Sequence, residues 1–502
     1  MVINISPNRT IYQKYFKDIK NMKDSRQATE FTYRTPFATF LTDLHNQIKL
    51  IEEPHKILGV GRPDFKALRG ASASIGLKIG FIETKDIGKN LDKIVKMEQF
   101  QRYLDGINNI ILTDYIRFML FRNKQKLYDF SLFTVQDLSN VNHQIPNNLI
   151  DNFKQMLEDF FNYDLEPIKD AEELSIELSK KTKLLKDLAL TQLKHDINAI
   201  ANNQNITLIH DFYEGLQLLM PNIKKEDCAD AFAQTISYGL LMSKINSANQ
   251  TFQAITAFRD IPQNFKVIRF LLRTVTDPDI PIIPWIIEDL VALLKKADLV
   301  NIFAAIKFKG EKKEDPFTYF YENFLAYYDP DKRKKLGVYY TPREVVFYII
   351  KAVNQFLQSE FNKPLGIGED DVIVLDPATG TGNFLWRAYT VAIKEIKNAG
   401  LQGILANKIE SHILKDFIGF EILITPFIIA NIKLMMVLKE NNYTLKPNDK
   451  IQVYLTDTLE DVIGQVRIAF GRAITNEAKD ANKIKRVMLI CFKIVDINLL
   501  RK

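Results

Sequence analysis

The stretch from Val372 to Leu385 constrains the fold of this chain more than any other. It begins with a short apolar run, rich in β-branched residues, that is typical of a buried strand. Asp376 ends this run, a turn containing Gly380 and Gly382 follows, and a helical pattern comes next. Strand, glycine turn and helix together predict the first unit of a doubly wound α/β fold, in which ligands bind at the carboxyl ends of the strands.

The glycine turn narrows the choice of ligand. A dinucleotide site of the G-x-G-x-x-G type needs a third glycine where Leu385 stands, which disfavours a nicotinamide or flavin. An acidic residue at a strand end followed by G-x-G closely resembles the first motif of S-adenosylmethionine (AdoMet) methyltransferases. In that family the glycines let the backbone approach the cofactor, and the acidic residue faces its positive methionine part. Taken alone, the motif could also be a glycine turn that merely ends a strand.

Two later strands also end in acidic residues. The segments Phe417–Glu421 and Ile451–Leu459 are each typical of a short buried strand, and the second contains Asp457. In the methyltransferase pattern, the resemblance implies that Glu421 accepts hydrogen bonds from the ribose hydroxyls. It also implies that Asp457 receives the adenine amino group of the cofactor. Each acid alone could be a solvated strand end, but their order and intervals agree with the family.

A loop ahead of the first motif, Gly337-Val-Tyr-Tyr-Thr-Pro342, closely resembles the extra cofactor motif of γ-class amino-methyltransferases acting on adenine. Thr341-Pro342 is equally a good helix start, and both interpretations can hold together. The basic run Lys332–Lys335 indicates either a solvated turn or a contact with DNA phosphates. The resemblance assigns AdoMet binding to Tyr339, Thr341, Pro342, Asp376, Pro377, Gly380, Gly382, Phe384, Glu421 and Asp457.

A second constellation lies near the start of the chain. Pro63-Asp64 precedes Glu83-Thr84-Lys85, and the segment Ile79–Lys85 is typical of a strand in which residues 83 and 85 share one face. Two carboxylates on adjacent strands can hold Mg²⁺, and the lysine can orient the attacking water and offset charge on a phosphate. This arrangement resembles the PD-(D/E)XK nuclease core. An edge-strand salt pair between Glu83 and Lys85 is the alternative.

Further residues support the nuclease resemblance. Gln99 and Tyr103 share a helical face, as in the Q-x-x-x-Y helix of some branches of that family. Glu30 resembles the early glutamate of such domains, and Thr35-Pro36 predicts a helix start after it. The resemblance assigns the catalytic roles to Asp64, Glu83 and Lys85, with Glu30 and Gln99 in support, and the Mg²⁺ ligands to Asp64 and Glu83.

The chain of 502 residues is long enough for two to four domains. We expect an α/β multidomain protein: a PD-(D/E)XK-like α/β nuclease core over 1–138, an all-helical connector over 149–314, and a Rossmann-like methyltransferase sheet over 315–502. The connector shows apolar periodicity almost throughout. The net charge of +6 permits a polyanionic partner without establishing one.

The methyltransferase pattern stops before its catalytic turn. Adenine methylation in this family uses an (N/D/S)-P-P-(Y/F) turn after strand four, which holds a flipped-out base. This sequence has no two adjacent prolines, although Val487–Val495 could be strand four. The sheet would then be incomplete at the C-terminus. We therefore expect a truncated form, which a downstream polypeptide carrying Asn-Pro-Pro-Tyr and a target-recognition domain would complement.

Nuclease core, helical connector and γ-type methyltransferase together resemble type IIG restriction–modification enzymes. The resemblance implies double-stranded DNA as partner, methyl transfer from AdoMet to the adenine amino group, and Mg²⁺-dependent cleavage. An orphan methyltransferase with an inert nuclease domain, and a non-catalytic DNA- and AdoMet-binding fragment, are the alternatives. The sequence has no apolar run of the roughly 18 residues needed for a membrane span, and Cys228 and Cys491 lack metal-ligand spacing. We expect a cytoplasmic location.

Overall fold

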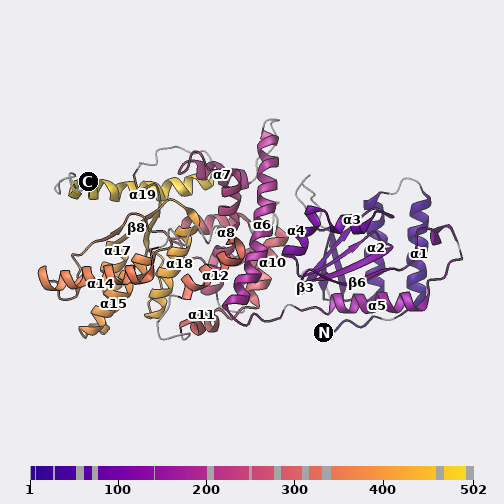
Figure 1. The fold of residues 1–502 in the computed structure, drawn as a ribbon, viewed down its shortest axis with the longest axis horizontal. Helices are drawn as coiled ribbons and strands as arrows, with labels where there is room; N and C mark the ends of the chain where they lie inside the picture. Colours follow the sequence, from indigo (N-terminus) through magenta and orange to yellow (C-terminus); the bar gives the residue numbers. More distant parts are fainter. Residues whose placement is uncertain are drawn as a thin grey trace. The chain divides into compact units, whose positions relative to one another are not determined.

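The computed structural model describes residues 2–5, 7–25, 29–52, 62–70, 77–140, 142–164, 166–200, 208–247, 252–275, 284–307, 316–330, 341–459 and 469–492. The chain divides into two compact units, Met1–Glu166 and Pro167–Lys502 (Figure 1). Among the helices that the structure describes, none is long and apolar enough to span a lipid bilayer.

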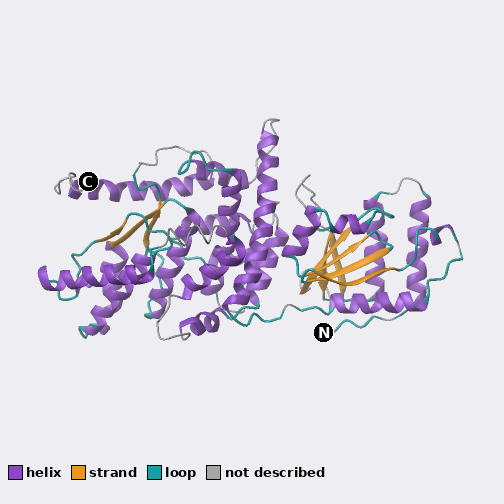
Figure 2. Cartoon of the chain, in the orientation of Figure 1, coloured by secondary structure: helices purple, strands orange, loops and turns teal. Residues whose placement is uncertain are grey.

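The first unit contains a mixed six-stranded sheet in the order β1-β2-β3-β4-β5-β6 (Figure 2). Neighbouring strands are antiparallel except β3 and β4, whose parallel pairing requires the crossover made by α3 and α4. Its elements are α1 (Arg9–Asp24), α2 (Glu30–Leu44), β1 (Ile48–Glu52), β2 (Phe65–Arg69), β3 (Leu77–Thr84), α3 (Leu91–Val95), α4 (Glu98–Gly106), β4 (Asn109–Thr113), β5 (Arg117–Arg122), β6 (Gln125–Ser131), the 3-10 turn η1 (Asp137–Ser139) and α5 (Asn147–Phe161).

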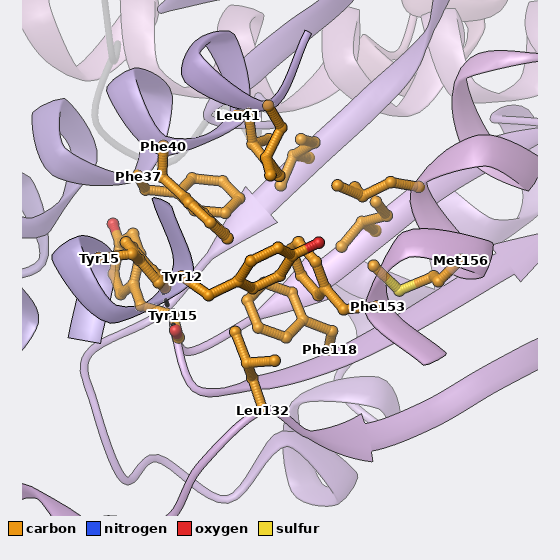
Figure 3. Packing of buried hydrophobic residues seen from close by; sticks show 14 of the residues in the cluster. Tyr12, Tyr15, Phe37, Phe40, Leu41, Tyr115, Phe118, Leu132, Phe153 and Met156 are labelled. Atoms are coloured by element: carbon orange, nitrogen blue, oxygen red, sulfur yellow. Dashed lines mark hydrogen bonds between the residues drawn. The ribbon is translucent and has the colours of Figure 1, made fainter. Parts of the chain in front are cut away.

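The core of this unit is rich in aromatic rings (Figure 3). Tyr15 of α1 stacks on Phe40 of α2 with ring centroids 4.1 Å apart, and Phe153 of α5 meets Phe118 of β5 edge-on at 4.8 Å. Helix α5 buries an apolar face at helical spacing in this core. The first unit therefore extends through α5, beyond the boundary at residue 138 expected from the sequence, and takes in the start of the expected connector.

Helix α2 begins earlier than the sequence predicts. Thr29 precedes its first turn, where the Thr29 backbone N–H donates to Thr32 Oγ1 over 3.0 Å. Pro36 therefore lies inside the helix rather than at its start, so the predicted start at Thr35-Pro36 is wrong. An interior proline costs about 3 kcal/mol, and the buried rings of Phe37 and Phe40 offset that cost.

The second unit begins with helices, as the apolar periodicity predicts. Helix α6 is the longest of the described elements at 30 residues, and it packs against α8 and α12. These helices lie in the same compact unit as the second sheet. The elements of this part are α6 (Ala171–Ile200), α7 (Leu208–Gln217), α8 (Lys225–Asn246), the 3-10 helix η2 (Ala254–Asp260), α9 (Lys266–Val275), α10 (Pro284–Lys295), α11 (Leu299–Lys307) and α12 (Pro316–Tyr328).

The described strands of the second unit form a three-stranded parallel sheet in the order β7-β8-β9. Helices α15 and α18 make the crossovers, and α19 packs on Ile418, Phe420 and Tyr454. The elements are α14 (Arg343–Glu360), η3 (Gly366–Gly368), β7 (Val374–Asp376), α15 (Asn383–Asn398), η4 (Gln402–Ile404), α16 (Leu405–Lys408), the π-helix η5 (Ile409–Ile413), α17 (Leu414–Asp416), β8 (Phe417–Glu421), α18 (Ile424–Glu440), β9 (Gln452–Leu455) and α19 (Ala469–Phe492).

Two sequence predictions about this unit are wrong in detail. Strand β7 is half-buried and begins at Val374, because among the described residues it pairs on one side only, with β8. The run from Val487 is not a fourth strand as far as Phe492, because α19 continues through it. No glycine or proline separates this run from the helical pattern before it. Residues 493–495 lie outside the described part.

Candidate functional sites

The two acids predicted to bind Mg²⁺ meet in the first unit. Asp64 directly precedes β2, and the antiparallel pairing of Phe65 with Ile82 places Asp64 across from Glu83 on β3. Both side chains are buried. Asp64 Oδ2 accepts hydrogen bonds from the backbone N–H of Thr84 over 2.7 Å and from its hydroxyl over 2.8 Å. The end of β3 therefore fixes the orientation of the Asp64 carboxylate.

Lys85 lies beside this acidic pair. Its Nζ forms an ion pair with Glu83 Oε1 and donates to the carbonyl of Thr84 over 2.8 Å. Strand β3 is flanked by β2 and β4, and Glu83 is buried, so this pair is not the edge-strand surface pair that was the alternative. A lysine held beside two buried acids can both neutralise them and approach a phosphate.

Helix α4 brings the predicted glutamine and tyrosine together. Gln99 Nε2 donates to Tyr103 Oη over 3.0 Å, as their helical spacing predicts. Tyr103 is buried, and burial raises its pKa well above its ordinary value, with a further contribution from the negative charge of Glu83. Tyr103 is therefore buried within range of the Glu83 charge, whereas Gln99 is exposed to solvent.

Sequence reasoning missed Arg34. Its buried guanidinium forms an ion pair with Asp64 Oδ1 through Nη2 and with Glu52 Oε1 through Nη1, the latter over 2.9 Å. Because the helix was predicted to start at Thr35-Pro36, Arg34 was not expected to lie in it. A helix that begins at Glu30 carries positions 30 and 34 on one face. Glu30 is the first residue of α2, and its side chain lies outside the described part.

The acidic pair fits Mg²⁺, although among the described residues no group of three or more His, Cys, Asp or Glu could hold a metal ion. Magnesium keeps several of its waters in proteins and is bound through one or two carboxylates. Asp64 and Glu83 supply that number. Thr84, the residue after Glu83, already directs one oxygen of Asp64. The donor set is therefore sufficient for a hydrated divalent cation.

The three acids predicted to bind AdoMet lie at one edge of the second unit's sheet. Asp376 is the last residue of β7, and Glu421 is the last residue of β8. Asp457 follows the end of β9 by two residues. Because all three strands are parallel, their carboxyl ends meet at the same edge. The structure therefore brings together these acids, which lie far apart in the sequence.

A direct hydrogen bond joins the glycine turn to the second strand. The backbone N–H of Gly380 donates to Glu421 Oε2 over 2.7 Å, and that of Leu423 donates to Oε1 over 2.7 Å. Thr379 N–H also donates to the carbonyl of Phe420 over 3.0 Å. Burial raises the pKa of Glu421 even though these N–H groups stabilise its charge. The carboxylate also accepts from the Ile422 N–H, which leaves it a lone pair for a ligand donor.

Asp376 carries the clearest sign of an unfilled interaction. Its Oδ1 accepts from Ala378 N–H over 3.2 Å, while Oδ2 is buried and has no hydrogen-bond partner among the described residues. Burial raises the pKa of this carboxyl group. A Cβ at Gly380 would meet nothing within 4 Å, so the turn faces open space. An orphaned carboxylate oxygen beside an open glycine turn fits a ligand with a positive charge and hydrogen-bond donors.

Helix α19 forms hydrogen bonds with the residues that follow β9. Lys485 is buried and donates to Thr456 Oγ1 over 3.0 Å and to the carbonyl of Asp457. Asp457 Oδ1 accepts from Leu459 N–H over 2.8 Å. Thr458 Oγ1 donates to the carbonyl of Pro377 over 2.6 Å, which ties this end to the glycine turn. No sequence pattern indicated this role for Lys485, because a lysine in a charged helix is usually solvated.

The remaining predicted residues are only partly described. Tyr339 and the basic run Lys332–Lys335 lie outside the described residues. Thr341 and Pro342 directly precede α14, and Phe384 lies in the first turn of α15, half-buried. Phe384 therefore lies directly after the glycine turn, at the amino end of α15.

The two motif glycines are expected to differ in their tolerance of alanine. Both have a positive φ, +53° for Gly380 and +78° for Gly382, which costs any other residue about 1–2 kcal/mol. A Cβ at Gly382 would also lie 2.9 Å from the Cβ of Ala430, which adds overpacking of about 1–3 kcal/mol. Gly382→Ala should therefore destabilise the second unit more than Gly380→Ala.

Denaturation followed by tryptophan fluorescence measures this difference, because both tryptophans, Trp285 and Trp386, lie in the second unit. An equal loss of stability in the two variants, or a larger loss at Gly380, would contradict the packing of Gly382 against α18.

The sequence of this region has a match among protein families. Residues 312–477 match the N-6 DNA Methylase family. This match covers about a third of the chain, and a family of this kind implies AdoMet as the cofactor. The match contains the glycine turn and all three strands that carry the acids. No curated protein matches the sequence.

Several solved structures resemble the chain at low identity. The DrdV–DNA complex has 20% identity and a TM-score of 0.38, covering 95% of this chain and 42% of that one. A nuclease-deletion mutant of the type ISP restriction–modification enzyme LlaGI, in complex with a DNA substrate mimic, has 20% identity and a TM-score of 0.41, with coverage of 67% and 24%. The type IIG restriction endonuclease BpuSI has 12% identity and a TM-score of 0.26, with coverage of 85% and 41%. This chain spans less than half of the length of each of these solved chains.

Proposed function

We propose that this chain is the nuclease-bearing and AdoMet-binding part of a DNA restriction–modification enzyme that methylates adenine. The observation that carries the proposal is the edge where β7, β8 and β9 end, within the region that matches N-6 DNA methylases. There Asp376 has a buried oxygen without a hydrogen-bond partner in the described part of the chain, and Glu421 receives a hydrogen bond from the glycine turn. The type IIG arrangement and the Mg²⁺-dependent nuclease are the further parts of this proposal.

The residues of the sheet edge can each take one part of AdoMet. Glu421, held by two backbone N–H groups, is oriented to accept from the ribose hydroxyls. Asp376 offers its orphaned oxygen to the positive methionine part, and Asp457 accepts from the adenine amino group. When bound, AdoMet supplies the methyl group. The protein contributes position and charge complementarity.

In the first unit, the proposed reaction is hydrolysis of a DNA phosphodiester. Asp64 and Glu83 would hold Mg²⁺, which supplies a Lewis acid and an activated water when bound. Lys85, paired with Glu83, is positioned to orient the water and to offset charge that develops on the phosphate. Gln99, exposed and bonded to Tyr103, would contact the DNA near the scissile bond.

A second candidate function is an AdoMet- and DNA-binding module that does not transfer the methyl group by itself. The observation that favours it is the absence of adjacent prolines from the sequence, because the family holds its target base in an (N/D/S)-P-P-(Y/F) turn. Methylation that appears only after a polypeptide with that turn is added would support the module. Methylation by this chain alone would exclude it.

We predict that, on acidification, AdoMet affinity begins to fall at a higher pH than it would at a site whose carboxyl groups have ordinary pKa values. Burial raises the pKa values of Glu421 and Asp376, and their charged forms make the stronger hydrogen bonds. Affinity should therefore fall as the pH decreases through these raised values, beginning above the usual glutamate pKa of about 4.3. Calorimetric titration with AdoMet over a pH series measures this, and constant affinity down to about pH 4 would contradict it.

The stability of the unliganded second unit should change in the opposite direction. A carboxyl group whose folded-state pKa is raised stabilises the folded state at low pH, and this contribution is lost as the pH rises through the folded-state pKa. Tryptophan fluorescence during denaturation at each pH supplies this second readout on the same protein.

Two assays on the full chain test the proposed function directly. Calorimetry with AdoMet should show one binding site per chain. Plasmid DNA should be cut in the presence of Mg²⁺ and left intact with EDTA. Absence of AdoMet binding would overturn the methyltransferase part, and metal-independent or absent cleavage would overturn the nuclease part. The two outcomes are independent, because the sites lie in separate compact units.

A further inference from the structure

We infer that Arg34 is a positioning residue that holds Asp64 in place of the metal ion and releases it when the ion binds. The inference rests on the proposed nuclease site and adds a residue that the nuclease motif does not contain. Each of the two buried acids forms an ion pair with a different basic side chain. Glu83 pairs with Lys85, and Asp64 pairs with Arg34.

The two oxygens of Asp64 have different partners. Oδ2 accepts from the backbone N–H and hydroxyl of Thr84, which lies at the end of β3. Oδ1 forms the ion pair with Arg34 Nη2. A metal ion shared with Glu83 needs an oxygen of Asp64 that is not committed to the strand. Arg34 therefore occupies the oxygen that the metal requires.

The surroundings of Arg34 let it give up this contact without becoming an isolated buried charge. Its Nη1 is bonded to Glu52 Oε1 over 2.9 Å, and Glu52 is about half exposed. The guanidinium also lies over the ring of Phe31, 4.4 Å from its centroid. These contacts keep a partner and a cation–π surface for Arg34 after Asp64 turns to the metal.

The charges around Asp64 determine whether a substitution strengthens or weakens metal binding. Without metal, Arg34 and Lys85 pair with Asp64 and Glu83, so the buried carboxylates are not isolated charges. A divalent cation at the pair brings two more positive charges close to the guanidinium, and like charges repel. Loss of the Arg34 charge should therefore strengthen metal binding, and loss of the Glu52 charge should weaken it.

Direct binding of Mn²⁺, measured by the free-ion electron paramagnetic resonance signal in the absence of DNA, tests the inference on the full chain. Arg34→Gln should bind Mn²⁺ about tenfold more tightly than wild type, the effect of removing one adjacent like charge. Glu52→Gln should bind it several-fold more weakly. The second variant changes a half-exposed side chain, so the test stands if Arg34→Gln does not fold, as judged by circular dichroism.

Two control variants distinguish a specific effect of Arg34 from an effect of net charge and from a failure of the proposed nuclease site. Arg69→Gln removes one positive charge from β2, where Arg69 donates to the carbonyl of Phe161, and it should leave Mn²⁺ affinity unchanged. An increase equal to that of Arg34→Gln would mean bulk charge and overturn the inference. Asp64→Asn should abolish binding, and retained binding would overturn the nuclease site itself. If Asp64→Asn abolishes binding while Arg34→Gln leaves it unchanged or weaker, only the role of Arg34 fails.

Discussion

Asp64→Asn is expected to reduce Mg²⁺-dependent DNA cleavage by about 10³-fold, the upper range for losing one electrostatic stabiliser of a transition state. Asp64 is buried across from Glu83, with its carboxylate oriented by Thr84. Asparagine keeps the shape of the side chain and removes the charge that a metal ion needs. The initial rate of plasmid nicking under saturating Mg²⁺ measures the effect.

The matched control is Asp105→Asn, an exposed acid of the same unit that pairs with Lys124 at the surface. It should cleave at the wild-type rate, since exposed pairs contribute little to structure. AdoMet binding by Asp64→Asn should also be unchanged, because its site belongs to the other unit. Cleavage at the wild-type rate by Asp64→Asn would exclude this pair as the cutting site.

The second large effect is expected at Asp376. Asp376→Asn should weaken AdoMet binding about 100-fold, in the range for losing a charged hydrogen-bond partner worth about 1.5–3 kcal/mol. The variant should nevertheless not unfold more easily without ligand, because the wild-type carboxylate has a buried oxygen with no partner among the described residues. Burial also raises its pKa, which marks the charged form as costly in the unliganded state.

Calorimetry gives the affinity of this variant, and tryptophan fluorescence during denaturation gives the stability of the second unit. Asp371→Asn is the control, because Asp371 is an exposed acid on the same segment that pairs with Lys363. It should match wild type in both measurements. Loss of stability in Asp376→Asn without loss of affinity would mean that Asp376 is structural.

The sequence predicted the positions that depend on local pattern. Strand β8 has the predicted bounds, Phe417–Glu421, because an apolar run between polar segments marks a strand clearly. Period-two alternation placed Glu83 and Lys85 together, and helical spacing placed Gln99 beside Tyr103. Such contacts lie within a few residues of each other, so the pattern determines them.

Contacts that depend on how a helix packs against a sheet could not be predicted. Arg34 meets Asp64 only through the packing of α2 against the sheet, and the misplaced start of α2 removed the helical spacing that could have indicated it. Lys485 reaches the end of β9 from a helix whose apolar run favoured a strand. The sequence also could not show which carboxylate oxygen of Asp376 has no partner within the described ranges, since that depends on burial.

A crystal structure of the chain with AdoMet would show whether the three acids at the sheet edge hold this cofactor. The nucleoside should lie at the carboxyl ends of β7, β8 and β9, with its ribose hydroxyls at Glu421 and its methionine part at Asp376 Oδ2. Electron density for AdoMet at any other surface, or none at saturating concentration, would contradict it.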